Sequence, residues 1–336
     1  MKFYLCVFIF CFSSLVYSKD SICVVLKETT DYNHYIKRIE RVFSNTIDKK
    51  FYNIHSLKHN SEINKIAAVV NEIKTRGCKI IFGGVSSTDS IKLVKILADK
   101  SILFITPTSS SIKIKEIHKK TIYMSLDDNH VVKSLVNKTK DLEGRFIVFR
   151  NLSYPNTNYI ATQLFQKLKF LKRDIEIIDI ISGVDIKLTK KQLMSDYFLI
   201  PTYEKDLINI HNAIKENKKR VMFGIDAWGT NLSVYKKFAL NDKYFNSIKL
   251  DYWNHNTCSL PSFIETCNKY KKEFPKKGFD SFMAIAYDSA QYLNSIVKNE
   301  KKTEFMTFKN VIDRKIVKES HFYTITHKKY LYLETK

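Results

Sequence analysis

The segment from Gly77 to Ser111, GCKIIFGGVSSTDSIKLVKILADKSILFITPTSSS, constrains the fold more than any other part of the chain. An apolar run ends at Gly83-Gly84, apolar residues recur at helical spacing from Ile91 to Leu97, and a second apolar run ends at Pro107. This order of strand, helix and strand predicts a parallel sheet with both hydroxyl-rich turns at the carboxyl ends of their strands. Open α/β sheets bind ligands at that edge.

The hydroxyl-rich turns have two chemical interpretations. Ser86, Ser87 and Thr88 come at the start of the predicted helix, where unpaired N–H groups and the helix dipole favour an anion such as a carboxylate. Serine, threonine and aspartate are also preferred N-caps, which satisfy the same donors without a ligand. Because a second such turn follows the next strand, the two interpretations stand on an equal footing.

The same alternation of strands and helices continues along the chain and predicts an α/β fold with two lobes. The expected strands are 21–26, 51–56, 146–149, 175–181, 197–200, 221–224, 322–325 and 330–333, and the expected helices are 35–43, 63–73, 159–171, 207–214 and 281–297. We expect the helix at 281–297 to pack on the first lobe and the last strands to return to the second. The predicted division is therefore 19–142 plus 254–320 for lobe 1 and 143–253 plus 321–336 for lobe 2.

Residues 1–18 have the pattern of a secretory signal peptide. Lys2 precedes an apolar stretch from Phe3 to Phe12, and small or polar residues lead to an expected cleavage point near Ser18. The stretch is too short, and too soon followed by Lys19, to predict a membrane span. We therefore expect a periplasmic or otherwise exported protein.

Four cysteines follow the predicted signal peptide, and disulfides are plausible in an oxidising compartment. Cys258 and Cys267 are close enough in sequence to close a small loop and are the preferred pair. Cys23 and Cys78 lie at the starts of strands expected to be neighbours, and this pattern allows either a disulfide or two buried thiols.

The charge and the motif content exclude several classes of function. The formal net charge is +22, which is typical of proteins that bind nucleic acids or anionic membranes. The lysines are spread along the whole chain with only short runs such as Lys190-Lys191, so we expect solvated lysines and no nucleic-acid partner. The sequence has no CxxC or HExxH motif, no serine nucleophile elbow and only scattered histidines, so we expect no metal, no cofactor and no enzymatic activity.

Six segments resemble, in order, the type I periplasmic solute-binding proteins, in particular the branched-chain and related amino-acid receptors of ABC transporters. These segments are IIFGGVSSTDS, ILFITPTSSS, FRNLSYPNTN, YFLIPTYEKDL, VMFGIDAWGT and AIAYDSAQYL. The resemblance implies two Rossmann-like lobes joined by three crossover strands, which close on the ligand about a hinge.

The resemblance also implies a set of ligand-binding residues. Ser87 matches the position that bonds the ligand α-carboxylate, and Thr108 and Ser110 match positions that hold the carboxylate and ammonium. Asp226 matches the acidic partner of the α-ammonium, with a capping aspartate as the alternative. Weaker or second-lobe contacts are Tyr154, Tyr203, Trp228 and Ser86, and the first three could equally be wall or core residues.

The resulting functional hypothesis is an exported receptor that captures a small amino acid or analogue between its lobes and delivers it to an ABC permease. We expect a monomer. A sensory module that signals to a chemoreceptor or kinase, or an exported scaffold without a ligand, remains an alternative. The first-lobe loop LKETTDYNHY lacks the small residues that such receptors have near the ligand, so the sequence leaves the ligand's identity open.

Overall fold

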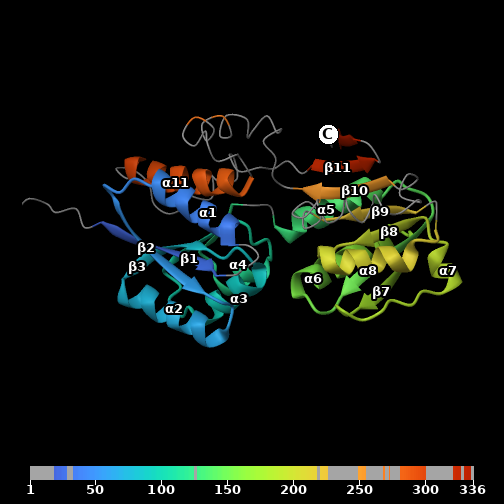
Figure 1. Cartoon of the computed structure of the whole chain (residues 1–336), viewed down its shortest axis with the longest axis horizontal. Helices are drawn as coiled ribbons and strands as arrows, with labels where there is room; N and C mark the ends of the chain where they lie inside the picture. Colours follow the sequence, from blue (N-terminus) through green and yellow to red (C-terminus); the bar gives the residue numbers. More distant parts are fainter. Residues whose placement is uncertain are drawn as a thin grey trace, which may run out of the picture.

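The computed structural model describes residues 19–28, 33–124, 127–217, 220–225, 249–254, 268, 272, 281–299, 321–326 and 329–333. Within them the strands form two separate sheets, one at each end of the molecule's long axis (Figure 1). We call the parts built on these sheets lobe 1 and lobe 2.

Lobe 1 contains a parallel sheet with the strand order β2-β1-β3-β4-β5. Its strands are β1 (Asp20–Lys27), β2 (Tyr52–His59), β3 (Cys78–Gly83), β4 (Leu103–Thr106) and β5 (Thr121–Tyr123). Its helices are α1 (Asn33–Thr46), α2 (Ile63–Thr75), α3 (Ser87–Ile96), α4 (Lys113–Ile117) and the late α11 (Ser281–Asn299).

Lobe 2 contains a sheet with the strand order β12-β11-β10-β9-β8-β6-β7, parallel from β7 to β10 and antiparallel at β11 and β12. Its strands are β6 (Arg145–Asn151), β7 (Asp174–Ile180), β8 (Tyr197–Ile200), β9 (Val221–Gly224), β10 (Lys249–Asn254), β11 (His321–Thr326) and β12 (Lys329–Leu333). Its helices are α5 (Asp128–Thr139), α6 (Pro155–Phe170), α7 (Lys190–Leu193) and α8 (Glu204–Ile214).

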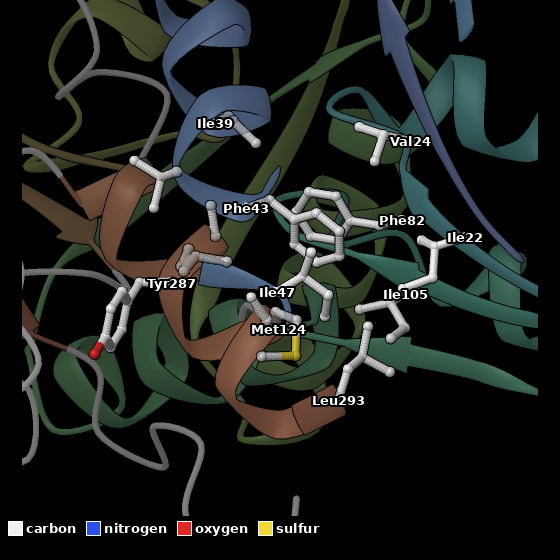
Figure 2. Packing of buried hydrophobic residues seen from close by; sticks show 14 of the residues in the cluster. Ile22, Val24, Ile39, Phe43, Ile47, Phe82, Ile105, Met124, Tyr287 and Leu293 are labelled. Carbon is white, nitrogen blue, oxygen red and sulfur yellow. The ribbon is translucent and has the colours of Figure 1, made fainter. Parts of the chain in front are cut away.

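Both faces of the lobe 1 sheet are covered by helices, which explains why its strands are apolar throughout. Ile22, Val24 and Leu26 of β1 pack towards α1 and α11, while Cys23 and Val25 pack towards α2 and α3. On the α1 face the rings of Phe43 and Phe82 stack with their centroids 3.9 Å apart (Figure 2). Successive side chains of a strand point to opposite faces, so one continuous apolar run supplies both cores.

Helix α11 completes the core of lobe 1 although it follows strand β10 of lobe 2. It lies beside α1, and its residues Tyr287 and Leu293 join the cluster around Phe43 (Figure 2). Asn294 anchors it, because its Nδ2 donates to the Thr46 carbonyl at 2.9 Å and its Oδ1 accepts from the Asp48 backbone N–H at 2.8 Å.

Helix α5 corrects the boundary at residue 142 that the sequence predicted, because this helix packs in lobe 2. Its buried residues Val131, Val132 and Leu135 contact the core that also contains Phe146 of β6. The chain therefore leaves lobe 1 before Asp127, and it passes between the lobes again from β10 to α11 and from α11 to β11.

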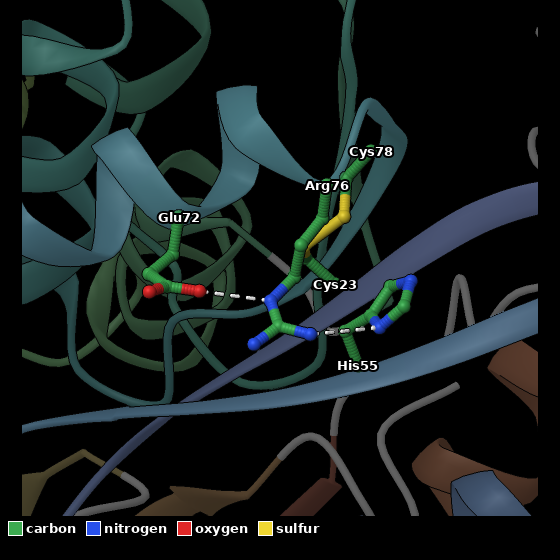
Figure 3. Close-up of a disulfide and its surroundings, with 5 residues drawn as sticks. All are labelled: Cys23, His55, Glu72, Arg76 and Cys78. Carbon is green, nitrogen blue, oxygen red and sulfur yellow. Dashed lines mark hydrogen bonds and ion pairs between the residues drawn. A yellow bond between two sulfur atoms is a disulfide. The ribbon is translucent and has the colours of Figure 1, made fainter.

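A disulfide joins Cys23 of β1 to Cys78 of β3, with the Cα atoms 5.8 Å apart (Figure 3). The structure thus selects the disulfide from the two alternatives that the sequence left open for these cysteines. Beside it, Arg76 bonds the Glu72 carboxylate at 2.9 Å and the His55 ring at 3.3 Å (Figure 3). The predicted pair Cys258 and Cys267 lies outside the described residues.

None of the helices in the described part of the chain is both long enough and apolar enough to cross a membrane.

Candidate functional site

In each lobe, two neighbouring strands lead to helices on opposite faces of the sheet. In lobe 1, β1 leads towards α1 on one face, whereas its neighbour β3 leads to α3 on the other. In lobe 2, β6 leads to α6 and its neighbour β8 leads to α8 on the opposite face. The connections diverge at such a switch point and leave a crevice at the carboxyl ends of the strands. Topology alone therefore places one candidate binding edge in each lobe.

The turn after β3 is shaped by two adjacent glycines. A Cβ atom on Gly83 would lie 2.0 Å from the Val25 carbonyl oxygen, and one on Gly84 would lie 2.1 Å from Ser90 Oγ. Gly84 also has a φ of +77°, a backbone conformation that favours glycine. The two glycines thus bring the start of α3 close to the end of β1.

The hydroxyl groups of the two predicted turns bind each other and the backbone. The Gly84 carbonyl accepts hydrogen bonds from Ser109 Oγ and from Thr106 Oγ1, the latter at 2.9 Å. Thr108 Oγ1 donates to the Val85 carbonyl at 2.8 Å. The structure therefore brings the turns after β3 and β4 together, and it uses the Thr108 side chain to hold them in place.

Ser86 and Ser87 have different roles within the first turn. Ser86 is the N-cap of α3: its Oγ accepts from the Asp89 N–H at 3.2 Å and donates to Asp89 Oδ2 at 2.7 Å. Ser87 Oγ accepts from the backbone N–H groups of Ser110 and Ser111 at 3.2 and 3.3 Å. Both lone pairs of Ser87 are then engaged, so its hydroxyl proton is the part that can be donated to an anion.

A charged pair at the same edge was not identified from the sequence. Asp89 is buried, accepts from Ser61 Oγ at 3.0 Å and lies 3.6 Å from the ammonium of Lys27, the last residue of β1. Burial, together with the charges of Lys27 and Lys92, lowers the pKa of the neighbouring His59, although Asp89 opposes this shift. The pairing joins residues far apart in sequence, so only the strand order could have indicated it.

In lobe 2 the two predicted tyrosines meet at the switch point. Tyr154 and Tyr203 are the N-cap residues of α6 and α8, and their rings contact edge to face with centroids 4.8 Å apart. Asn156 Nδ2 donates to the Tyr203 hydroxyl at 2.9 Å, and the Tyr203 side chain is 37% exposed. Asp226 and Trp228, predicted on the connection after β9, lie outside the described residues.

Below the tyrosine pair lies a buried polar cluster that the sequence analysis did not predict. The Asn151 amide, at the end of β6, donates to Asp206 Oδ2 at 2.9 Å and to Thr202 Oγ1 at 3.3 Å. Ser182 Oγ also donates to Asp206 Oδ2 at 2.9 Å. Asn151, Thr202 and Asp206 are all at most 2% exposed, so this cluster is part of the interior of lobe 2.

A hydrogen bond links the second hydroxyl turn to the first helix of lobe 2. The Ser110 carbonyl accepts from the Asp128 backbone N–H at 2.9 Å, at the start of α5. Asp127 caps this helix and bonds the His130 ring at 3.0 Å, which raises the pKa of His130.

Among the described residues, no group of three or more His, Cys, Asp or Glu side chains could hold a metal ion.

Solved structures share this fold at low sequence identity. The leucine-binding protein LivK from Thermotoga maritima is 14% identical, with 94% of this chain and 97% of that chain covered and a TM-score of 0.69. A branched-chain amino acid ABC transporter periplasmic ligand-binding protein from Burkholderia xenovorans is 12% identical, with 94% of each chain covered and a TM-score of 0.72. A solute-binding protein of an ABC transporter from R. palustris, in complex with benzoate, is 11% identical, with 94% of this chain and 96% of that chain covered and a TM-score of 0.67.

The fold is therefore that of the type I periplasmic binding proteins, as the resemblance implied. No family model and no curated sequence matches the chain.

Proposed function

We propose that this protein is an exported, non-enzymatic solute receptor that binds a small carboxylate-bearing molecule, in first place an amino acid, between its two lobes. The observation that carries the proposal is the placement of Ser87 and the tyrosine pair at the switch points of the two sheets. Polar donors on lobe 1 and aromatic rings on lobe 2 provide the two kinds of contact that a small amphiphilic ligand needs.

The carboxylate is the best supported feature of the ligand. Ser87 offers its hydroxyl proton at the N-terminus of α3, where the helix dipole also favours negative charge. The structural neighbours include a leucine-binding protein and a complex with benzoate, two ligands that share a carboxylate but not an ammonium. The ammonium partner would be Asp226, a role that follows from the sequence resemblance alone.

The Lys27–Asp89 pair and the Ser86 cap fit a supporting role at this edge. The Ser86 hydroxyl already donates to the Asp89 carboxylate and accepts from the Asp89 N–H. Ser87 is therefore the serine of this turn that is best placed for the ligand. Delivery to an ABC permease by a monomeric receptor is the physiological role that the fold and the predicted signal peptide favour. A permease gene beside the gene of this protein would support transport. A neighbouring chemoreceptor gene without a permease gene would support sensing.

The carboxylate assignment is tested by Ser87→Ala with two ligands, L-leucine and its amine-free analogue 4-methylpentanoate. Loss of a hydrogen bond to a charged group costs about 1.5–3 kcal/mol, so calorimetric titration should show both ligands weakened roughly 10-fold to 150-fold. The control is Ser101→Ala. Ser101 is exposed and lies two residues before β4, at the opposite edge of the sheet, so this variant should bind both ligands as the unmodified protein does. Equal affinities in Ser87→Ala and the control would remove Ser87 from the site.

The ammonium assignment is tested by Asp226→Ala with the same two ligands. We expect leucine to lose its stabilising shift in thermal denaturation, which is about 2.7 kcal/mol at a hundredfold excess over the dissociation constant. The amine-free analogue should not lose affinity, since it has no ammonium to pair. If leucine stabilises Asp226→Ala as well as the unmodified protein, the assignment is wrong.

A further inference from the structure

We propose that Asn151 and Asp206 form a positioning pair that sets the geometry of the Tyr154 and Tyr203 rings, and through them the affinity of the site. This inference rests on the proposed function for its ligand, but the positioning itself can be measured without one. Neither residue contacts the ligand in this scheme.

Asn151 is connected to all three strand ends at the switch point of lobe 2. It is the last residue of β6, which lies between β7 and β8 in the sheet. Its amide nitrogen lies 3.1 Å from Ser182 Oγ on the connection after β7 and 3.3 Å from Thr202 Oγ1 on the connection after β8, so that its two N–H hydrogens serve these two hydroxyls and Asp206 together. A single buried side chain therefore ties together the loops that diverge from adjacent strands.

Each tyrosine follows a residue that the cluster holds. Ser153, directly before Tyr154, donates its N–H to Asn151 Oδ1 at 2.9 Å and accepts from the Ser182 N–H at 3.1 Å through its Oγ. Thr202, directly before Tyr203, accepts from the Asn151 amide. The residues directly before both tyrosines are thereby bonded to the same amide group, Ser153 through its backbone N–H and Thr202 through its hydroxyl.

Asp206 supplies the acceptor that orients this amide. Its Oδ2 accepts from Asn151 Nδ2 and from Ser182 Oγ, both at 2.9 Å, and its own N–H donates to the Tyr203 carbonyl at 3.1 Å. Buried polar groups of this kind must be satisfied, so a changed donor or acceptor should move the loops rather than leave the group unpaired.

The strict requirement for one donor and one acceptor makes a reciprocal exchange possible. N151D would place two carboxylates in a buried site where the present donor and acceptor are 2.9 Å apart. Repulsion between them raises one apparent pKa of the pair, so the two carboxylates repel each other above that pKa and share a proton below it. D206N alone keeps an oxygen that can accept. The double variant N151D/D206N restores one amide and one carboxylate with their positions exchanged.

The experiment follows the two rings by 19F NMR in ligand-free protein labelled with 3-fluorotyrosine, with Y154F and Y203F used to assign the signals. We expect N151D to displace both signals at pH 7.5, acidification to pH 5 to reverse the displacement as the carboxylates share a proton, and the double variant to restore both positions. Unmoved signals in N151D, or a double variant that resembles N151D, would overturn the proposal.

Binding of L-leucine by the same variants gives the second readout. We expect N151D to bind up to about 100-fold more weakly at pH 7.5, as misplaced contacts can cost that much, and the double variant to return within about threefold of the unmodified protein. If the unmodified protein does not bind leucine, the proposed function fails on that ligand while the ligand-free signals still decide the positioning. If N151D does not fold, Ser182→Ala decides: displaced ring signals support the proposal and unmoved signals overturn it.

Discussion

At the scale of single residues, the turn after β3 shows how backbone geometry and chemistry depend on each other. Gly84 allows the chain to turn with a φ of +77°, and its carbonyl then accepts from the hydroxyls of Thr106 and Ser109. The sequence predicted this turn because two glycines end an apolar run before three hydroxyl residues. It could not separate the cap Ser86 from Ser87, since both are serines and only their hydrogen bonds differ.

Gly84→Ala should therefore destabilise the protein more than an alanine at another glycine of positive φ. The left-handed backbone costs about 1–2 kcal/mol, and the contacts of the new Cβ with Ser90 and Phe104 add about 1–3 kcal/mol. Gly183→Ala is the matched control, because Gly183 has a φ of +83° with nothing within 4 Å of the new atom. Urea denaturation of both variants measures the difference, and equal free energies of unfolding would show that the close contacts relax without cost.

The buried cluster of Asn151 and Asp206 marks the limit of residue-level prediction. The two residues are 55 positions apart, and each alone is an ordinary polar residue near the end of a strand or the start of a helix. Their contact depends on β6 and β8 being neighbours in register, which periodicity does not reveal. Strand order had to be known before the pair could be seen.

At the scale of elements, helix α4 and strands β4 and β5 are joined by a buried histidine. His118, the C-cap of α4, bonds the Ile102 carbonyl through Nε2 at 2.7 Å, and its own carbonyl accepts from Thr121 Oγ1 at 2.6 Å. The ring is fully buried, and burial lowers its pKa although the bond to Ile102 opposes the shift. The neutral ring, with its proton on Nε2, is the form that this position accepts.

The stability of lobe 1 should therefore fall as the pH falls below about 6.5, the ordinary histidine pKa. The folded pKa of His118 lies below that value, so its contribution is complete above the unfolded pKa and is lost as acid protonates the unfolded chain first. His118→Gln should lessen this slope, by at most about 1.4 kcal/mol per pH unit. Urea denaturation of both proteins between pH 5 and pH 8 measures the slope of the unfolding free energy with pH. His130, whose pKa is raised, contributes to this slope with the opposite sign and does so equally in both proteins. Identical slopes would contradict the assignment.

Elements were predicted well where the apolar pattern was long and poorly where partner choice mattered. The predicted strand 21–26 and helix 159–171 correspond to β1 (Asp20–Lys27) and α6 (Pro155–Phe170). The residues of α5 were placed in lobe 1 as part of the range 19–142, because the apolar residues Val131, Val132 and Leu135 indicate a buried face but not the sheet that covers it. The disulfide of Cys23 and Cys78 stayed undecided for the same reason: adjacency was predictable, whereas the register that brings the sulfurs together was not.

At the scale of the whole molecule, the two sheets have separate cores, so damage can be confined to one of them. Lobe 1 closes its core with α11, whose Asn294 bonds Thr46 and Asp48. None of the core clusters draws side chains from both sheets in the described part of the chain. A destabilising mutation in one lobe should therefore lower the local stability of that lobe and leave the other lobe unchanged.

Asn294→Ala should weaken lobe 1 by about 1–3 kcal/mol, because it leaves the half-buried Thr46 carbonyl and Asp48 N–H without this partner. Hydrogen exchange should show faster exchange in β1, β3 and α1, and unchanged protection in β6 and β8. Gln291→Ala, on the exposed face of the same helix, is the control, since its amide bonds only Tyr287 one turn away among the described contacts. Faster exchange in both lobes would show that they unfold as one unit.

The late position of α11 also has a consequence for biosynthesis. Phe43 and Phe82 are made early, yet the helix that covers their side of the sheet is translated only at residues 281–299. A nascent chain in which β1 to β5 have been translated still lacks α11 and exposes the apolar side chains that this helix later covers. We therefore expect this apolar surface to need shielding until α11 has been translated.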